Sequence, residues 1–359
     1  MPYLVLTLLT CCSLCFVKPK NTLRKGYEYQ YVFLFLLVIV FTVFYGIRYN
    51  VGIDYMTYYR VAQNRLYDVP LKGKGELFEP AFRLLYRIAD FFCLPANTIF
   101  LFGGFIMYLF LFYGIHQYSE NMALSFFIFF ASGMFFFSLN EFRQFIAVCI
   151  VFAGYGYCVS RLFFRWCAMI FLGYLFHHSA LIAFPMYFLY AIPLRRCFVN
   201  MLIIMSLVLK KIGVLEALCL LLSYIPGHFS NYATVLLYMI TEGSSGIIGY
   251  AYLVMIAVMT NCGWFVRMNK EELFFFKVFI FASFFQNIFY NVYMVGRLME
   301  YFSISLLVIY PAFCTRSKKS KAFYIFFLMI SVLFFLNLWK YMFFPPEDSR
   351  LHYQTVFSR

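Results

Sequence analysis

Seven isolated charged or hydrogen-bonding residues lie within or between the long apolar stretches of the chain. They are Arg48, Asp54, Glu79, Arg143, His177, His178 and Arg297. The planar guanidinium group of arginine pairs with phosphate oxygens through a fixed fork of donors. Carboxylates and neutral imidazoles can accept the proton of a reacting hydroxyl. We expect these residues to converge on one face of a helical membrane bundle, in a polar site that opens toward the outside of the cell.

Membrane helices are the elements that must position these residues. The chain has 359 residues, of which 64% are hydrophobic and only 12% are charged. A soluble domain with a polar surface does not have this composition. A helix needs about 20 apolar residues to cross the hydrocarbon layer. The sequence therefore predicts an all-α integral membrane protein, a single polytopic domain over residues 1–359 with about twelve transmembrane helices, although ten to thirteen fit the pattern.

The predicted spans follow one another along nearly the whole chain. They are residues 2–17, 28–46, 98–115, 122–138, 142–159, 162–176, 180–192, 198–209, 247–266, 273–291, 298–314 and 322–343. The three segments between residues 162 and 209 are short enough to be tilted, broken or re-entrant. The first stretch has no basic region before it, and Lys18 and Lys20 follow it, which is the reverse of a cleavable signal peptide. We expect it to remain as the first span.

The distribution of basic residues predicts the orientation. With the N-terminus outside, the short inner loops hold 14 Lys and Arg and 4 acidic residues, whereas the outer segments hold 14 and 11 over many more residues. Cytoplasmic loops are enriched in Lys and Arg, so this orientation is favoured, although Lys210 and Lys211 argue against it. The basic cluster at residues 316–321 is typical of a cytoplasmic anchor near anionic lipid, and we see no signal for nucleic-acid binding.

The longest polar interval covers residues 48–97 and is too long for a simple connector. We predict that it is an extracytoplasmic loop. Residues 80–92 have the pattern of an amphipathic helix on the outer membrane surface or along a cavity. Apolar Phe82, Leu85, Ile88 and Ala89 alternate there with Arg83, Arg87 and Asp90. Asp54 stands beside Tyr55 and Tyr58 in the first half, which is either a solvated loop or a loop that contacts substrate.

Two outer junctions carry the remaining polar residues of the first half. Helical spacing places Asn140, Arg143 and Gln144 on one face. An arginine costs about 2.5 to 3.5 kcal/mol at the centre of a membrane helix, so Arg143 faces a cavity or a partner, or it snorkels to the interface. His177 and His178 point about 100° apart on a helix, so at most one of them faces the same cavity. A structural hydrogen bond is the alternative for either histidine.

The last outer junction places Arg297 at the start of a span, with Glu300 three residues later. A simple Arg–Glu pair on one helix face is the alternative to a ligand site. No second histidine pair at ligand spacing accompanies His177, and the 11 cysteines are scattered through apolar segments like small buried hydrophobes. No glycine-rich phosphate loop is present. We therefore expect no metal, no cofactor and no nucleotide hydrolysis.

Five strings in order give the chain a family resemblance: RYNVGIDYMTY, EPAF, NEFRQFIA, FHHSA and GRLMEY. The chain resembles the EpsG family, which is similar to the Wzy-type polymerases of O-antigen and capsule, from about Asn21 to its end. The matching positions are Arg48, Gly52, Asp54, Tyr55, Tyr58, Glu79, Pro80, Asn140, Arg143, Gln144, Ala147, His177, Ser179, Ala180 and Arg297. Ile53 stands where a small polar residue is expected, and Ala81 where glycine is expected.

The resemblance implies a glycosyltransferase of the GT-C kind that joins polysaccharide repeat units carried on undecaprenyl diphosphate. It implies the bacterial cytoplasmic membrane as location, with the site facing outward, and lipid-linked oligosaccharide, membrane lipid and a chain-length regulator as partners. Arg48, Arg143 and Arg297 would bind the diphosphate, and Tyr55, Tyr58, Asn140 and Gln144 would position the glycan. For the proton acceptor we favour His177, with Asp54 as a positioning carboxylate, and Asp54 or Glu79 as the alternative bases.

Two other functions are compatible with a membrane protein of this kind. A flippase for lipid-linked oligosaccharides would have about twelve spans and basic cavities, but it should show internal repeats and no long charged outer loop. A membrane acyltransferase could use His177, yet it would leave the arginines unexplained. O-antigen, capsule and exopolysaccharide share the same donor chemistry, so each is a candidate product.

Overall fold

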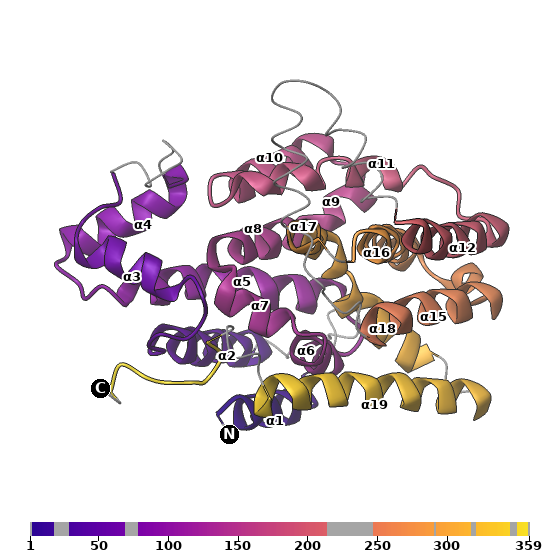
Figure 1. Ribbon diagram of the computed structural model, residues 1–359, viewed down its shortest axis with the longest axis horizontal. Coiled ribbons are helices and arrows are strands. Elements are labelled where there is room, and N and C mark those ends of the chain that lie inside the picture. Colours follow the sequence, from indigo (N-terminus) through magenta and orange to yellow (C-terminus); the bar gives the residue numbers. More distant parts are fainter. Residues whose placement is uncertain are drawn as a thin grey trace. The chain divides into compact units, whose positions relative to one another are not determined.

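The computed structural model describes residues 2–17, 29–68, 78–213, 247–290, 292–316, 321–344 and 350–357. It is all-helical, as predicted, and an isolated β-bridge joins Arg48 to Thr355 (Figure 1). The helices are α1 (Pro2–Leu14), α2 (Tyr29–Gly46), α3 (Tyr55–Gln63), α4 (Pro80–Phe91), α5 (Thr98–Tyr118), α6 (Met122–Ala131), α7 (Met134–Asn140), α8 (Phe142–Ala153), α9 (Tyr155–Val159), α10 (Phe163–Tyr174), η2 (His178–Ala183), α11 (Met186–Leu189), α12 (Arg196–Ile212), α15 (Ile247–Asn261), η3 (Trp264–Arg267), α16 (Lys270–Ile288), α17 (Tyr293–Ser303), α18 (Leu306–Arg316) and α19 (Lys321–Phe343).

The chain divides into two compact units. The first comprises Met1–Tyr187 and Leu307–Arg359, and the second comprises Phe188–Leu306. Parts of several predicted features lie outside the described residues. They are Lys18 and Lys20 after the first predicted span, Glu28 and Asn291 at the limits of two further predicted spans, residues 69–77 of the predicted outer loop, and residues 317–320 of the basic cluster.

Helical residues occur in each of the twelve predicted spans. Among the described residues, three helical segments are long and apolar enough to cross a membrane: Tyr29–Gly46, Thr98–Tyr118 and Phe142–Val159. The number rises to five if α6 with α7, and α17 with α18, each count as one bent span. Twelve crossings and a GT-C fold therefore stay predictions.

Helices α2, α5 and α8 pack side by side in the first unit (Figure 1). Glycines allow α8 to approach α5 closely. A Cβ atom added at Gly103 would lie 2.2 Å from Cζ of Phe142, and one at Gly114 would lie 2.6 Å from the ring of Phe152. Small residues commonly mediate such close contacts between membrane helices, because packing rather than exclusion from water drives their association.

The predicted span 122–138 is broken. Helices α6 and α7 meet at an angle of 58°, and Gly133 between them has a φ of +95°. Only glycine adopts this left-handed conformation without a steric penalty. A second break follows at Glu141, with a φ of −101° and a ψ of 47°, before α8 begins. The two breaks place Asn140 and Arg143 at a junction rather than within one continuous helix.

The helices of the first unit run alternately between two ends. We call the end where α2 finishes and residues 47–64 begin the loop end. Tyr3 at the start of α1 lies there, because its hydroxyl donates to the Leu351 carbonyl at 2.8 Å and its ring centroid is 6.0 Å from that of Phe44. At the opposite end, Tyr31 contacts His116 with ring centroids 5.5 Å apart. The alternation brings residues 48–58, 78–82, 140–144 and 175–179 to the loop end.

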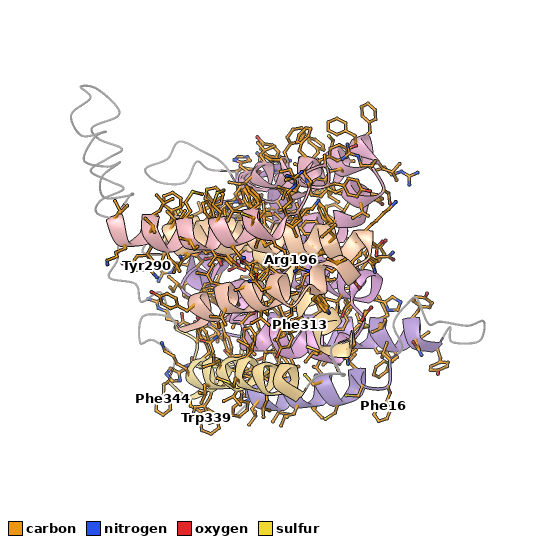
Figure 2. All side chains as sticks on the ribbon, turned by 90° about the vertical axis from the view of Figure 1, so that its right-hand side faces the viewer. Phe16, Arg196, Tyr290, Phe313, Trp339 and Phe344 are labelled. Carbon is orange, nitrogen blue, oxygen red and sulfur yellow. The ribbon has the colours of Figure 1, made fainter. Side chains whose placement is uncertain are left out.

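Apolar side chains cover the outside of the first unit. Figure 2 shows Trp339 and Phe344 pointing away from the body of the molecule at α19, where they are 45% and 70% exposed. Phe35 of α2 is 49% exposed. Large exposed apolar surfaces are rare on soluble monomers and are expected where a helix faces lipid. The ten cysteines within the described residues are all free.

Candidate functional site

An ion pair joins two of the motifs at the loop end. Glu79 is the N-cap residue of α4, and Pro80 occupies the first turn, where its missing amide proton costs no hydrogen bond. The guanidinium Nη1 of Arg143, in the first turn of α8, donates to Oε2 of Glu79. The Glu79 side chain is 7% exposed and that of Arg143 is 21% exposed. The structure thus connects two motifs that are 64 residues apart in the sequence.

Tyr58 holds a second edge of the same guanidinium group. Nε of Arg143 donates to the Tyr58 hydroxyl at 3.2 Å, and Cζ lies 4.9 Å from the ring centroid of Phe78. We call Tyr58, Phe78, Glu79 and Arg143 the Arg143 cluster. Nη2 of Arg143 makes no hydrogen bond within the part of the chain that the structure describes. This partly exposed donor can therefore serve a ligand anion.

Burial fixes the protonation state of Tyr58. The side chain is 5% exposed and packs on Phe82 and Phe142, with ring centroids 5.5 and 5.7 Å away. Burial raises the pKa of Tyr58 above its usual value near 10, and the positive charge of Arg143 only partly opposes this shift. The phenol consequently stays neutral at physiological pH, so its oxygen remains a stable acceptor for Arg143.

Residues 48–54 are fixed on the junction between α7 and α8. The backbone amide of Ile53 donates to Oδ1 of Asn140 at 2.9 Å. Gly52 has a φ of +97°, and a Cβ atom there would lie 2.1 Å from the Leu139 carbonyl oxygen, so no other residue fits. Asp54 follows as the half-buried N-cap residue of α3. Ile53, which stands where the resemblance predicts a small polar residue, is 48% exposed, so the loop accommodates it.

Arg48 has a different environment from Arg143. It is 0% exposed, and its Cζ lies 3.8 Å from the ring centroid of Tyr45 and 5.1 Å from that of Phe100. Nη1 donates to the Leu139 carbonyl at 3.2 Å, whereas Nε and Nη2 have no hydrogen-bond partner within the described residues. This geometry makes Arg48 an internal fastener between the end of α2 and the α7–α8 junction.

A segment close to the end of the chain pairs with residues 47–52. Three backbone hydrogen bonds of 2.9 Å join the two: Tyr49 N to Gln354 O, Gly52 N to Arg350 O, and Val356 N to Ile47 O. The ring of Tyr353 stacks on Phe44 with centroids 4.3 Å apart, and its hydroxyl donates to the Phe44 carbonyl at 2.7 Å. We call residues 350–356 the clasp. It was not predicted from the sequence, because a short polar stretch after an apolar helix has no pairing signal.

His177 is the N-cap residue of η2. Its Nδ1 accepts a hydrogen bond from the Ser179 amide at 3.2 Å and lies 2.6 Å from the Ser179 hydroxyl oxygen. An amide can only donate, so Nδ1 is the acceptor, and in the neutral ring the proton is on Nε2. The Ala81 amide donates to the Leu175 carbonyl at 3.0 Å, which brings the start of α4 against the end of α10. His178 is exposed, and its ring lies 4.7 Å from that of Tyr174.

The other predicted site residues lie in the interior or in the second unit. Tyr55 is 0% exposed and stacks on Phe100 with ring centroids 4.3 Å apart. Gln144 is 3% exposed. Arg297 is half-buried in α17 of the second unit, and Glu300 in the same helix is 7% exposed. Phe78, which contacts Arg143, was not predicted from the sequence, and its only signal is its position directly before Glu79.

A comparison with protein-family models identifies the family. Residues 31–355 match the model of the EpsG family. The chain belongs to the EpsG family. This family is a Wzy-like polymerase family, so the resemblance carried by the five motifs is confirmed, and the match includes the Arg143 cluster and most of the clasp. No curated protein and no solved structure matches the chain.

Proposed function

We propose that this EpsG-family protein is a polysaccharide polymerase that acts at the outer face of the cytoplasmic membrane. It transfers a growing glycan from undecaprenyl diphosphate to a lipid-linked repeat unit. A hydroxyl oxygen of the repeat unit bonds to the anomeric carbon of the glycan, and the bond from that carbon to the diphosphate oxygen breaks with its electron pair. The hydroxyl proton passes to a base, and undecaprenyl diphosphate leaves.

The single observation that carries this proposal is the partly exposed guanidinium of Arg143, held by Glu79 and Tyr58. Negative charge grows on the diphosphate as its bond to carbon breaks, and donors that are already in place stabilise that charge without reorganisation. Glu79 and Tyr58 fix the plane of the guanidinium group, which leaves Nη2 as the donor to a phosphate oxygen. Arg48 is left out of the phosphate site because none of its surface is exposed.

The environments of the candidate bases favour an exchange of the roles first expected for Asp54 and His177. Glu79 is engaged by Arg143, and Nδ1 of His177 is engaged by the Ser179 amide. Asp54 is half-buried at the loop end, and its charge contributes to the raised pKa of Tyr58, so it lies close to the Arg143 cluster. We assign Asp54 as the proton acceptor. His177 then has a positioning role.

The decisive test measures polymerisation by purified Arg143→Lys protein with lipid-linked repeat units in liposomes. Lysine keeps the charge but loses the fork of donors. A hydrogen bond to a charged group contributes about 1.5–3 kcal/mol, so we expect the rate to fall roughly ten- to hundredfold. The matched control is Arg60→Lys, an exposed residue of α3. Full-length glycan ladders from Arg143→Lys at normal protein levels would overturn the proposal.

Intact cells distinguish the reaction class. Cells that lack a polymerase display single repeat units at the surface. Cells that lack a flippase keep the units inside, and cells that lack an acyltransferase make glycans of normal length. Single displayed units in cells that carry only the Arg143→Lys protein support the polymerase, and either of the other results contradicts it.

A further inference from the structure

Helix α16 of the second unit contains a lysine in an apolar stretch that reads FFFKVFIF. The Lys277 side chain is buried, with 9% exposed, and its Nζ donates to the Tyr190 carbonyl at 2.9 Å. An ammonium group has three donors, so this bond satisfies one of them. No carboxylate within the described residues forms an ion pair with Lys277. A buried ammonium without a counter-ion is costly, and a bound anion would remove that cost.

Lys277 lines a cavity of about 210 Å³ together with nine apolar side chains. Its lining includes Leu189, Ile192 and Leu194 from the segment before α12, Phe198 of α12 and Phe281 of α16. The volume is below the roughly 300–1,000 Å³ of typical small-molecule pockets. The lining offers no hydroxyl or amide side chain for a sugar. Its shape and chemistry suit a segment of a hydrocarbon chain that lies beside one positive charge.

The cavity lies toward the basic end of the second unit. Asn200 of α12 and Asn261 of α15 exchange hydrogen bonds of 3.0 Å, and Asn287 near the end of α16 donates to Ser206 in the second half of α12 at 3.1 Å. Helices α12 and α16 therefore start at the same end, where Figure 2 shows Arg196, opposite to Tyr290. Exposed basic residues lie at this end: Arg195, Arg196 and Lys270. Lys277 is about 10 Å along the axis from the start of α16, within reach of lipid headgroups.

We propose that the Lys277 cavity binds an anionic phospholipid, with one acyl chain along its apolar side chains and the phosphate on the ammonium group of Lys277. Basic pockets between membrane helices at the cytoplasmic side bind anionic headgroups. Lys277 supplies the charge at the cavity, and Arg195 and Arg196 add positive potential at its rim. The inference uses residues of the second unit alone, so it stands or falls independently of the polymerase reaction.

Native mass spectrometry of the full purified chain tests the proposal. The protein is titrated with phosphatidylglycerol or with phosphatidylcholine of the same acyl chains. We expect wild-type protein to bind phosphatidylglycerol more tightly. Lys277→Met should lose about fivefold in affinity for phosphatidylglycerol and little for phosphatidylcholine, because one basic residue near the surface contributes about that factor. Lys277→Arg should keep the preference, as should the matched control Lys210→Met at the other end of α12.

Two results would overturn the proposal. One is unchanged phosphatidylglycerol affinity in Lys277→Met, and the other is an equal loss for both lipids, which would reduce Lys277 to a support for the Tyr190 carbonyl. If Lys277→Met does not fold, Leu194→Trp provides the second test, because the larger ring fills the cavity. Binding of both lipids should then fall, and wild-type binding by Leu194→Trp would exclude the Lys277 cavity as the site. Polymerisation by the same proteins reports separately on the Arg143 cluster.

Discussion

Two arginines at the loop end of the first unit have opposite surroundings. Arg48 is sealed among aromatic rings and has one backbone acceptor, whereas Arg143 pairs with a carboxylate and a phenol and is partly exposed. Both stand in family motifs at apolar boundaries, so the sequence predicted the same role for both. The comparison teaches that the three-dimensional surroundings, rather than the residue type, separate an arginine that supports the fold from one that can bind a ligand.

The largest loss of activity should come from a substitution of Asp54, which lies close to the Arg143 cluster. Asp54→Asn removes the proposed proton acceptor while it keeps the size of the side chain. General base catalysis contributes about 10²–10⁴-fold, so we expect a loss of that order in single-turnover transfer, with donor binding retained.

His177→Ala sharpens this assignment. It removes the cap of η2, and we expect a smaller loss of roughly tenfold, with His178→Ala as the neighbouring control. A loss of 10² or more in His177→Ala, together with near-normal transfer by Asp54→Asn, would return the role of base to His177.

Arg48→Ala tests the structural role of the buried Arg48. The substitution leaves a cavity among Tyr45, Phe100 and Phe142, and large-to-small changes of this kind cost about 3–5 kcal/mol. We expect a marked fall in thermal stability of the purified protein, with Arg60→Ala as the exposed control. Normal stability combined with a selective loss of donor binding would erase the difference between the two arginines.

Glu79→Gln tests the ion pair that holds Arg143 in place. Loss of the negative charge leaves Arg143 without its ion-pair partner, and we expect polymerisation to fall about ten- to hundredfold. If the two residues act as one unit, the double variant Glu79→Gln/Arg143→Lys should be little worse than Arg143→Lys alone. Additive losses in rate would show that they act separately.

Tyr353→Ala tests the clasp, which pairs with residues 47–52 at the loop end. The variant loses one aromatic stack and one hydrogen bond, together about 1–3 kcal/mol. We expect a moderate fall in thermal stability, while Tyr353→Phe, which keeps the ring, should lose less. Equal stability of all three proteins would mean that the clasp does not hold residues 47–52 in solution.

The mildest substitutions test which side of the membrane the loop end faces. Cysteines are introduced singly at exposed Gln63 and Ser160, at the loop end and the opposite end of the first unit, in a cysteine-free background. We expect an impermeant thiol reagent to label the cysteine at position 63 in intact spheroplasts and to spare the one at position 160. The reverse pattern would place the Arg143 cluster in the cytoplasm.

The sequence predicted the positions of the helices well, because stretches of about 20 apolar residues have few other stable structures in a membrane. It also predicted that motifs far apart in the chain converge, and those of Glu79 and Arg143 meet because the helices of the first unit alternate in direction. The convergence of Arg297 of the second unit with them stays a prediction. The partnership of Glu79 with Arg143 did not follow, because it depends on how α4 docks against α8. The Ser132–Gly133 dipeptide was the available sign of the break in span 122–138.

The burial of Arg48 could not be read from its neighbours in the sequence. The rings of Phe100 and Phe142 that enclose it come from helices roughly 50 and 90 residues further along the chain. The clasp was hidden for a similar reason, because backbone pairing leaves no mark on side-chain identity. Both features are products of tertiary packing, which no local pattern encodes.

The hydrogen bond between Tyr3 and Leu351 also restricts the number of times that the chain can cross the membrane. It fastens the start of α1 and the clasp at one end of a single compact unit, so we expect both segments on the same side of the membrane. A chain that leaves one face and returns to it crosses an even number of times. Of the ten to thirteen crossings that fit the apolar pattern, ten and twelve satisfy this rule, and reporters placed beside Tyr3 and beside Leu351 should report the same compartment.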